Sequence, residues 1–211
     1  MYLLWEHGNV RSREAFTEIE TLQGNRYTPE LTHLKVRIEM IDRKYDDALN
    51  ALSTENSDAL DAQFIYKPRS LYYAEIYHEQ NKLELARAYY DSARIHLEEQ
   101  IAVNPEDERF YSTLGIIYAG LGRKKEAIER GLKAISLMPL KKDFYNAIFR
   151  LEDMARIYTM VGEYDLALEQ IDELLSIPSL MSVNLLKNDP VWEPLWNYPG
   201  FKNLIEKYSD N

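Results

Sequence analysis

The stretch "LGIIYAGLGRKKEA", residues Leu114 to Ala127, decides the fold of this chain. Tyr118 follows Gly115 by three positions, so both lie on one helix face, where the glycine admits a neighbouring helix and the ring fills the remaining gap. Gly122 then ends the helix. Ala127 begins a stripe that returns seven residues later, so a second helix can press against the first. The stretch therefore predicts a pair of antiparallel helices.

The same spacing recurs elsewhere in the sequence, which is the mark of a repeat architecture. A shift of forty residues pairs Leu114 with Met154, Gly115 with Ala155, Tyr118 with Tyr158, Gly122 with Gly162 and Ala127 with Ala167. A shift of forty-one in the other direction places Ala74, Tyr77, Asn81, Ala86 and Ala93 on Gly115, Tyr118, Gly122, Ala127 and Ala134. A weaker fourth copy lies upstream, where "KYDDALNAL" resembles "EYDLALEQI".

Residues Glu108 to Lys141 resemble a tetratricopeptide repeat, a helix–turn–helix unit of about 34 residues. Tyr111 stands where that family usually has Trp, and the other family positions are held by Leu114, Gly115, Tyr118, Ala127, Ala134 and Pro139. The resemblance implies an all-α, right-handed α-solenoid of about four repeats over residues 28–179. It adds a partial N-terminal repeat in residues 1–27, at "REAFTEIETL", and a helical capping segment in residues 180–211.

Two insertions depart from the repeat length. Seven extra residues between Ala93 and Pro105 keep a helical pattern, which predicts a second helix two turns longer than usual. About six more precede Leu151, so we expect the first helix of the last repeat to start early.

The C-terminal segment is rich in Pro and aromatic residues. A solenoid needs a cap, because its last repeat would otherwise leave an apolar flank in water. The side chains expected to supply that cover are Trp192, Leu195, Trp196, Phe201, Leu204 and Ile205. Asp189 with Pro190 predicts one helix start, and Pro199 predicts another.

This segment is also similar to the end of tetratricopeptide arrays in multidomain bacterial regulators. The matching residues are Asp189, Pro190, Trp192, Pro194, Leu195, Pro199 and Phe201. In those proteins the array follows an adenylate cyclase, a serine/threonine kinase or a winged-helix domain. The resemblance implies a sensor or scaffold region, and the bulky opening "YLLW" suggests a piece of a longer protein.

The composition excludes some classes of binding partner. The chain has 211 residues and a formal net charge of −10, which disfavours nucleic acid as a ligand. No apolar run is long enough for a membrane span, so we expect no membrane insertion. We expect a cytoplasmic location, although the absence of cysteine leaves a periplasmic one open, and a homodimer is compatible with the sequence.

No motif for catalysis or cofactor binding is present. The glycines before Lys124 are in the wrong register for a phosphate loop, and the four histidines form no metal-ligand motif. A basic cluster from Arg123 to Lys133 is interrupted by Glu126 and Glu129, which predicts the pairs Glu126–Arg130 and Glu129–Lys133 on a solvated helix. We therefore predict a non-enzyme with no metal or cofactor.

In tetratricopeptide arrays, the first helix of each repeat lines a concave groove that binds partners. The resemblance places these residues there: His33, Arg37, Met40, Leu71, Glu75, His78, Ser112, Ile116, Ala119, Glu152, Arg156 and Thr159. The Lys and Asn pattern of family members that clamp chaperone tails is absent. Substitution of Tyr118 or Ala127 is expected to unfold the array, whereas changes at Glu75 or Arg156 should weaken binding alone.

Three functional readings remain open at this point. The first is a protein-interaction module that binds a peptide, a helix or another domain in the groove. The second is a regulatory region that acts in cis on an effector domain of a larger signalling protein. The third, an enzyme built on the groove, would need a deep closed pocket with converging polar groups.

Overall fold

The structure, a computed structural model, describes residues 14, 17–18, 21, 28–54 and 56–209. Most of these residues are helical, as the sequence predicts. The predicted partial repeat in residues 1–27, with the stretch "REAFTEIETL", falls outside the described residues except at isolated positions. No described helix combines the length and the apolar character that crossing a membrane requires.

The elements follow one another as helix pairs. In chain order they are α2 (Pro29–Ile41), α3 (Tyr45–Ser53), β1 (Ala59–Asp61), β2 (Tyr66–Pro68), α4 (Arg69–Glu79), α5 (Leu83–Val103), α6 (Glu108–Gly120), α7 (Lys124–Leu137), α8 (Phe144–Met160), α9 (Tyr164–Ser176), α10 (Val183–Asn188), the 3-10 helix η2 (Pro190–Leu195) and α11 (Pro199–Ser209). Helices α2 with α3, α4 with α5, α6 with α7, and α8 with α9 pack against each other as neighbours in the chain.

Small residues set the distance between these helices, as the spacing around Gly115 predicts. A Cβ atom at Gly115 would lie 2.6 Å from Cδ1 of Ile157 and 3.1 Å from the carbonyl oxygen of Ala127. Ala127, like Ala167, has no exposed surface. Helices α6, α7 and α8 therefore meet where only a hydrogen or a methyl group fits.

The turn inside each helix pair has the same backbone geometry. One residue adopts a left-handed φ in each: Arg43 at 58°, Asn81 at 57°, Gly122 at 74° and Gly162 at 76°. The next residue, Lys44, Lys82, Arg123 or Glu163, has φ between −91° and −89° and ψ between 63° and 68°. Glycine or asparagine tolerates the left-handed region best, which explains why two of these turns contain glycine.

The two insertions lengthen helices as expected. Helix α5 has 21 residues and α8 has 17, whereas α6 and α9 have 13 each. Helix α5 ends before Pro105 and α7 before Pro139, where the missing amide hydrogen stops a helix.

A short hairpin between α3 and α4 was not predicted from the sequence. Strands β1 and β2 are antiparallel, with Ala59 opposite Pro68 and Asp61 opposite Tyr66. Every residue of β2 is buried, and Tyr66 packs edge-on against Phe110. The Tyr66 hydroxyl shares a hydrogen bond of 2.7 Å with Nε2 of His96, which lies in the lengthened part of α5. The hairpin forms because tertiary contacts supply its stability; three residues per strand are too few alone.

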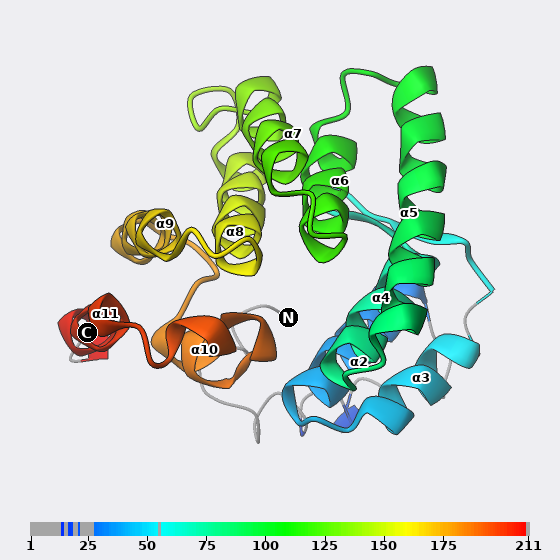
Figure 1. The fold of residues 1–211 in the computed structure, drawn as a ribbon, viewed down its shortest axis with the longest axis horizontal. Helices are drawn as coiled ribbons and strands as arrows, with labels where there is room; N and C mark the ends of the chain where they lie inside the picture. The colour runs from blue at the N-terminus through cyan, green and yellow to red at the C-terminus, as the bar shows by residue number, and fades with distance from the viewer. Residues whose placement is uncertain (1–13, 15–16, 19–20, 22–27, 55, 210–211) are drawn as a thin grey trace.

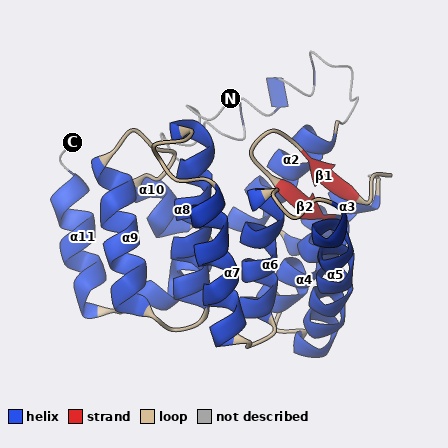
Figure 2. Cartoon of the chain, turned by 90° about the horizontal axis from the view of Figure 1, so that it is seen from above, coloured by secondary structure: helices blue, strands red, loops and turns tan. Residues whose placement is uncertain are grey.

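The helices are arranged along an arc (Figure 1). Helices α2, α4, α6 and α8 lie toward its interior, and the segment that contains α10 lies between the two ends of the arc, close to α2 (Figure 1). Figure 2 shows α7, α8, α9 and α11 side by side, with the hairpin at one end of the helix layer near α2. We call the side of the arc formed by α2, α4, α6 and α8 the inner face.

The C-terminal segment covers two surfaces. Helix α11 packs against α9, and Phe201, Leu204 and Ile205 are buried there in one apolar cluster with Ile171 and Leu174. Trp192 and Leu195 are almost fully buried and Trp196 is half-buried, its indole N–H donating to the carbonyl of Leu186 at 2.9 Å. The Asp189–Pro190 start is present, but the helix that follows is the 3-10 helix η2, which packs on α8. The segment thus caps the array and also borders its inner face.

Candidate functional site

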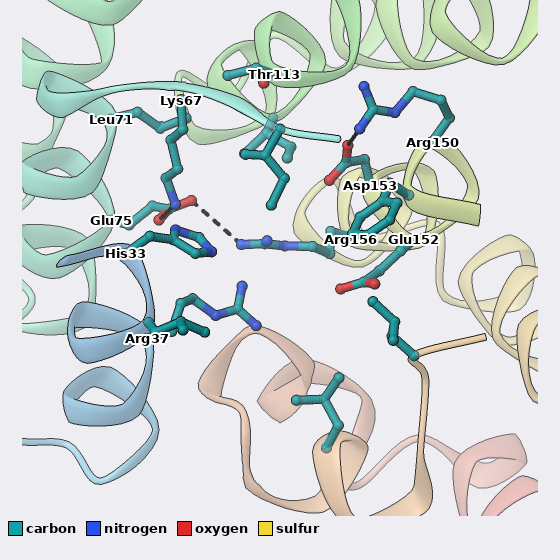
Figure 3. A pocket seen from close by; sticks show the side chains of 16 residues that line it. His33, Arg37, Lys67, Leu71, Glu75, Thr113, Arg150, Glu152, Asp153 and Arg156 are labelled. Atoms are coloured by element: carbon teal, nitrogen blue, oxygen red, sulfur yellow. Dashed lines mark hydrogen bonds and ion pairs between the residues drawn. The ribbon is translucent and has the colours of Figure 1, made fainter. Parts of the chain in front are cut away.

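The inner face borders a partly open cavity of about 90 Å³, which we call the inner cavity. Its walls come from four helices, the hairpin and the C-terminal segment (Figure 3). The lining residues are His33, Leu34, Arg37, Ile65, Lys67, Leu71, Glu75, Thr113, Ile116, Phe149, Arg150, Glu152, Asp153, Arg156, Leu180 and Leu185. Charged groups converge at its centre, and apolar side chains complete its walls.

A second cavity, of about 200 Å³, lies beside the first and shares Arg37, Glu75 and Arg156 with it. Its other walls are mostly apolar, with Met40, Met160 and Val191 among them. The C-terminal segment contributes to this cavity from Asp189 to Pro194. Three charged residues therefore form the boundary between the two chambers.

The structure brings together almost all the residues that the sequence placed in the groove. His33, Arg37, Leu71, Glu75, Ile116, Glu152 and Arg156 line the inner cavity, and Met40, His78, Ala119 and Thr159 line the second one. Ser112 lines neither cavity, but its hydroxyl donates a hydrogen bond to the carboxylate of Asp153, which faces the inner cavity. Ser112, Ile116 and Ala119 are buried.

Sequence reasoning missed the groups that come from outside the helix pairs. The hairpin contributes Lys67 and the preceding Ile65 to the inner cavity, and the C-terminal segment contributes Leu180 and Leu185. A lysine within the apolar run "FIYKP" was the available signal, because a charged residue among buried ones needs a partner.

Glu75 is the centre of a buried ion network. Its carboxylate accepts a hydrogen bond from the Lys67 ammonium and pairs with the Arg156 guanidinium at 3.4 Å. Burial would raise the pKa of Glu75, but the two cations outweigh it and hold that pKa below its usual value. Burial lowers the pKa of Lys67 to about 8, against the opposing effect of Glu75. The Lys67 ammonium also lies 4.3 Å from the ring centroid of Tyr72.

The sequence led us to expect that substitutions at Glu75 or Arg156 would weaken binding alone, but both side chains are mostly buried. Glu75 is only 8% exposed, and the Arg156 side chain is 13% exposed. Removing Glu75 leaves the buried Lys67 and Arg156 without their shared carboxylate, and removing Arg156 leaves Glu75 with Lys67 as its one remaining ion-pair partner among the described residues. Substitutions at these two positions therefore act on stability as well as on binding.

Two ion pairs tie the C-terminal segment to the first helix pair. The guanidinium of Arg37 donates to the Asp189 carboxylate at 2.7 Å, and both side chains are largely buried. Arg43 and Glu193 form a second, exposed pair at 3.1 Å. The Asp189 carboxylate also accepts from the backbone N–H of Val191, which orients it.

His33 is held as a neutral side chain. Its Nδ1 shares a hydrogen bond of 2.6 Å with the Tyr72 hydroxyl. Burial, followed by the charges of Lys67, Arg37 and Arg156, keeps the pKa of His33 well below its usual value. The imidazole thus offers a polar contact but no positive charge to a ligand.

The acidic side of the cavity comes from α8. Arg150 donates to the carbonyl of Phe64 at 2.5 Å and lies 3.6 Å from the carboxylate of Asp153. Burial raises the pKa of Glu152, whose carboxylate points toward the centre of the cavity (Figure 3). Across the space from it are Lys67 and Glu75 (Figure 3).

The arrangement is suited to binding a polar ligand. Within the described ranges no group of three or more His, Asp or Glu side chains is placed to hold a metal ion. The cavity presents ionised donors and acceptors in a poorly solvated space, where each hydrogen bond to a ligand is strengthened.

No protein-family model matches the chain, and no curated protein matches it either.

Proposed function

We propose that this chain is a non-catalytic binding module, built as a right-handed solenoid of tetratricopeptide-type repeats, whose ligand occupies the inner cavity. The repeated turn geometry and the buried small residues support the solenoid. The observation that carries the binding role is the convergence of Arg37, Glu75, Ile116 and Arg156, one from each of the four inner helices, on one space.

The C-terminal segment limits the size of the ligand. Leu180, Leu185 and Asp189 border the two cavities, and Asp189 is tied to α2 through Arg37. A helix or a folded domain would have to displace this segment to reach the inner face. A small molecule or a short polar chain end needs no such displacement, so we favour a ligand of that size over the larger partners that the sequence left open.

A sensor role within a larger regulator is the second candidate. A ligand in the inner cavity would contact α2 and the C-terminal segment together, because Arg37 and Leu185 line the same space. Such a ligand would couple the two ends of the array, and a linked effector domain could respond to that coupling.

A cavity-filling variant tests the binding role. Leu180 lies in a loop and lines the inner cavity, so Leu180→Trp should fill the space at little cost in stability. The matched control is Leu132→Trp, at a position that is 49% exposed on α7. Thermal-shift screening with metabolites and short peptides should find a ligand that stabilises the unmodified chain and the control but not the filled variant. Equal shifts in all three proteins, or no shift with any compound, would contradict the proposal.

A further inference from the structure

Three charged residues of α8 line the inner cavity with hydrogen-bonding capacity that the described residues leave unused. In the part of the chain that the structure describes, Nε and Nη1 of Arg150 lack a partner, and so do atoms of Glu152 and Arg156, which lie one helical turn apart. The guanidinium of Arg156 donates through Nη2 to Glu75 at 3.4 Å, but its buried Nε has no partner among the described residues. Glu152 precedes Arg156 by one helical turn. No hydrogen bond or ion pair joins its carboxylate to the described part of the chain.

The charges around Glu152 and Arg156 do not balance locally. Glu75 is shared by two cations, Lys67 and Arg156, so one positive charge on that side is in excess. The other cations of the cavity have their own carboxylates, because Arg37 pairs with Asp189 and Arg150 lies near Asp153. The carboxylate of Glu152 lies in the same space, across from Lys67 and Glu75 (Figure 3). Burial raises its pKa, and the charges of Arg37 and then Arg156 oppose this effect.

The spacing of the two groups fits a ligand that carries both signs of charge close together. Residues four apart on a helix have Cβ atoms about 5–6 Å apart and lie on one face. An α-amino acid attaches its ammonium and its carboxylate to the same carbon. It can therefore present the carboxylate to Arg156 and the ammonium to Glu152 without an extended conformation.

The size and walls of the cavity restrict the side chain of such a ligand. A volume of about 90 Å³ is smaller than the roughly 150 Å³ of a cavity that accommodates benzene. The walls beside the charged groups are apolar, with Ile65, Ile116, Phe149 and Leu185 among them. A methyl group matches this volume and these apolar walls.

We propose, on the basis of the binding role proposed above, that the inner cavity binds a free α-amino acid of about the size of alanine. Its carboxylate accepts hydrogen bonds from Arg156, and its ammonium donates to Glu152. Burial raises the pKa of Glu152 in the chain alone. A ligand ammonium lowers that pKa again and keeps the carboxylate ionised.

Four matched probes test this by isothermal titration calorimetry on the full chain. L-alanine carries both charges, propionate has the same skeleton without the ammonium, ethylamine has no carboxylate, and β-alanine separates the two charges by one more carbon. We expect L-alanine to bind at least tenfold more tightly than each of the others. Propionate binding as tightly as L-alanine would overturn the proposal in favour of a simple anion site.

A variant at Glu152 gives a second, independent readout. Glu152→Gln keeps the shape of the side chain but removes its charge, so L-alanine should bind at least tenfold more weakly and propionate more tightly than to the unmodified chain. Glu169→Gln, on the exposed face of α9, is the control and should change neither affinity. The same alanine affinity in both variants would contradict the assignment of Glu152. If Glu152→Gln does not fold, the four-probe comparison on the unmodified chain still decides the question.

The failure of this inference is distinguishable from the failure of the binding role. If L-alanine does not bind but another compound stabilises the chain and loses its effect in Leu180→Trp, the cavity is a binding site for a different ligand and the amino-acid proposal is wrong. If L-alanine binds equally well to Leu180→Trp, it binds elsewhere, and the proposal is wrong for that reason.

Discussion

Two regions of the molecule are stabilised in different ways. One is the contact where α6, α7 and α8 meet, and the other is the inner cavity. In the first, a glycine on each of α6 and α7 lets the apolar side chains of Ile157 and Met154 approach to distances that a Cβ atom would forbid. In the second, Lys67, Glu75 and Arg156 bring unlike charges together where water is scarce. The first region needs only the repeat to form, whereas the second needs the hairpin and the C-terminal segment to close around it.

The difference teaches that a repeat specifies its packing locally but does not specify its inner surface. Most apolar contacts are made between helices that are neighbours or next neighbours in the chain, such as α6 with α7 and α6 with α8, so spacing within one or two helix pairs determines them. The ion network joins residues from distant segments, and Arg37 reaches Asp189 across most of the sequence. Substitutions in the two regions should therefore fail in different ways.

The largest effect is expected in the cavity. Glu75→Ala removes the carboxylate that neutralises both Lys67 and Arg156, so we expect a loss of about 3–5 kcal/mol in the free energy of unfolding. Chemical denaturation measures it. The control, Glu126→Ala, removes an exposed carboxylate and should change stability by no more than about 0.5 kcal/mol. If the two variants were equally stable, Glu75 would act in binding alone, as the sequence suggested.

The next effect is expected where α6, α7 and α8 meet. Gly115→Val places methyl groups where Ile157 and the backbone of Ala127 already lie, so we expect a loss of about 3 kcal/mol, at the upper end of the usual cost of overpacking. The affinity of the cavity for its ligand should remain unchanged in the fraction that stays folded. Denaturation followed by titration checks both, and a stable Gly115→Val protein would show that the helices do not approach this closely.

A smaller effect separates backbone conformation from packing. At Gly122 an added Cβ would meet nothing within 4 Å, but φ is +74°, so Gly122→Ala should cost about 1–2 kcal/mol through the backbone alone. The equivalent residue in the preceding pair is Asn81, and Asn81→Gly should be neutral or slightly stabilising. Thermal melting compares the two, and a loss of stability in Asn81→Gly would argue against equivalent turns.

The smallest effect is a change in pH dependence near the C-terminal segment. Burial raises the pKa of Glu79 to about 7, with Asp189 and then Glu193 adding to it and Arg43 opposing. The folded state therefore holds a proton that the unfolded state releases, so the stability that Glu79 contributes is present below pH 4.5 and is lost as the pH rises toward 7.

Glu79→Gln should remove this component. Denaturation midpoints measured between pH 4.5 and 7 should fall less steeply in the variant than in the unmodified chain, so the stability of the variant relative to the unmodified chain should be higher at pH 7 than at pH 4.5. Parallel profiles for the two proteins would mean that Glu79 is not shielded by the C-terminal segment.

The same comparison explains which features of the structure could be predicted from the sequence and which could not. The spacing of Gly115 and Ala127 predicted the helix pairs. The family resemblance predicted twelve groove residues, and eleven of them line the two cavities. The hairpin escaped prediction because its strands are stabilised by contacts with Phe110 and His96, which are distant in sequence.

Surface pairing was also predicted incorrectly. In place of Glu126–Arg130 and Glu129–Lys133, the structure pairs Arg123 with Glu126 at 2.8 Å and Lys125 with Glu129 at 3.8 Å. Arg130 and Lys133 instead lie over the ring of Tyr111, at 5.9 and 5.8 Å from its centroid. Several partners compete for each exposed charge at similar energy, so helical spacing alone does not select among them.

The most direct test of this account is a distance measurement across the closure of the inner face. The chain contains no cysteine, so Lys44→Cys with Asn188→Cys gives two unique, exposed spin-label sites beside the contacts that tie α2 to the C-terminal segment. Double electron–electron resonance should give one short and narrow distance distribution, which Asp189→Ala should broaden. A long, broad distribution in the double-cysteine protein without Asp189→Ala would show that the segment does not close the inner face. That result would contradict both the cavity and its proposed ligand.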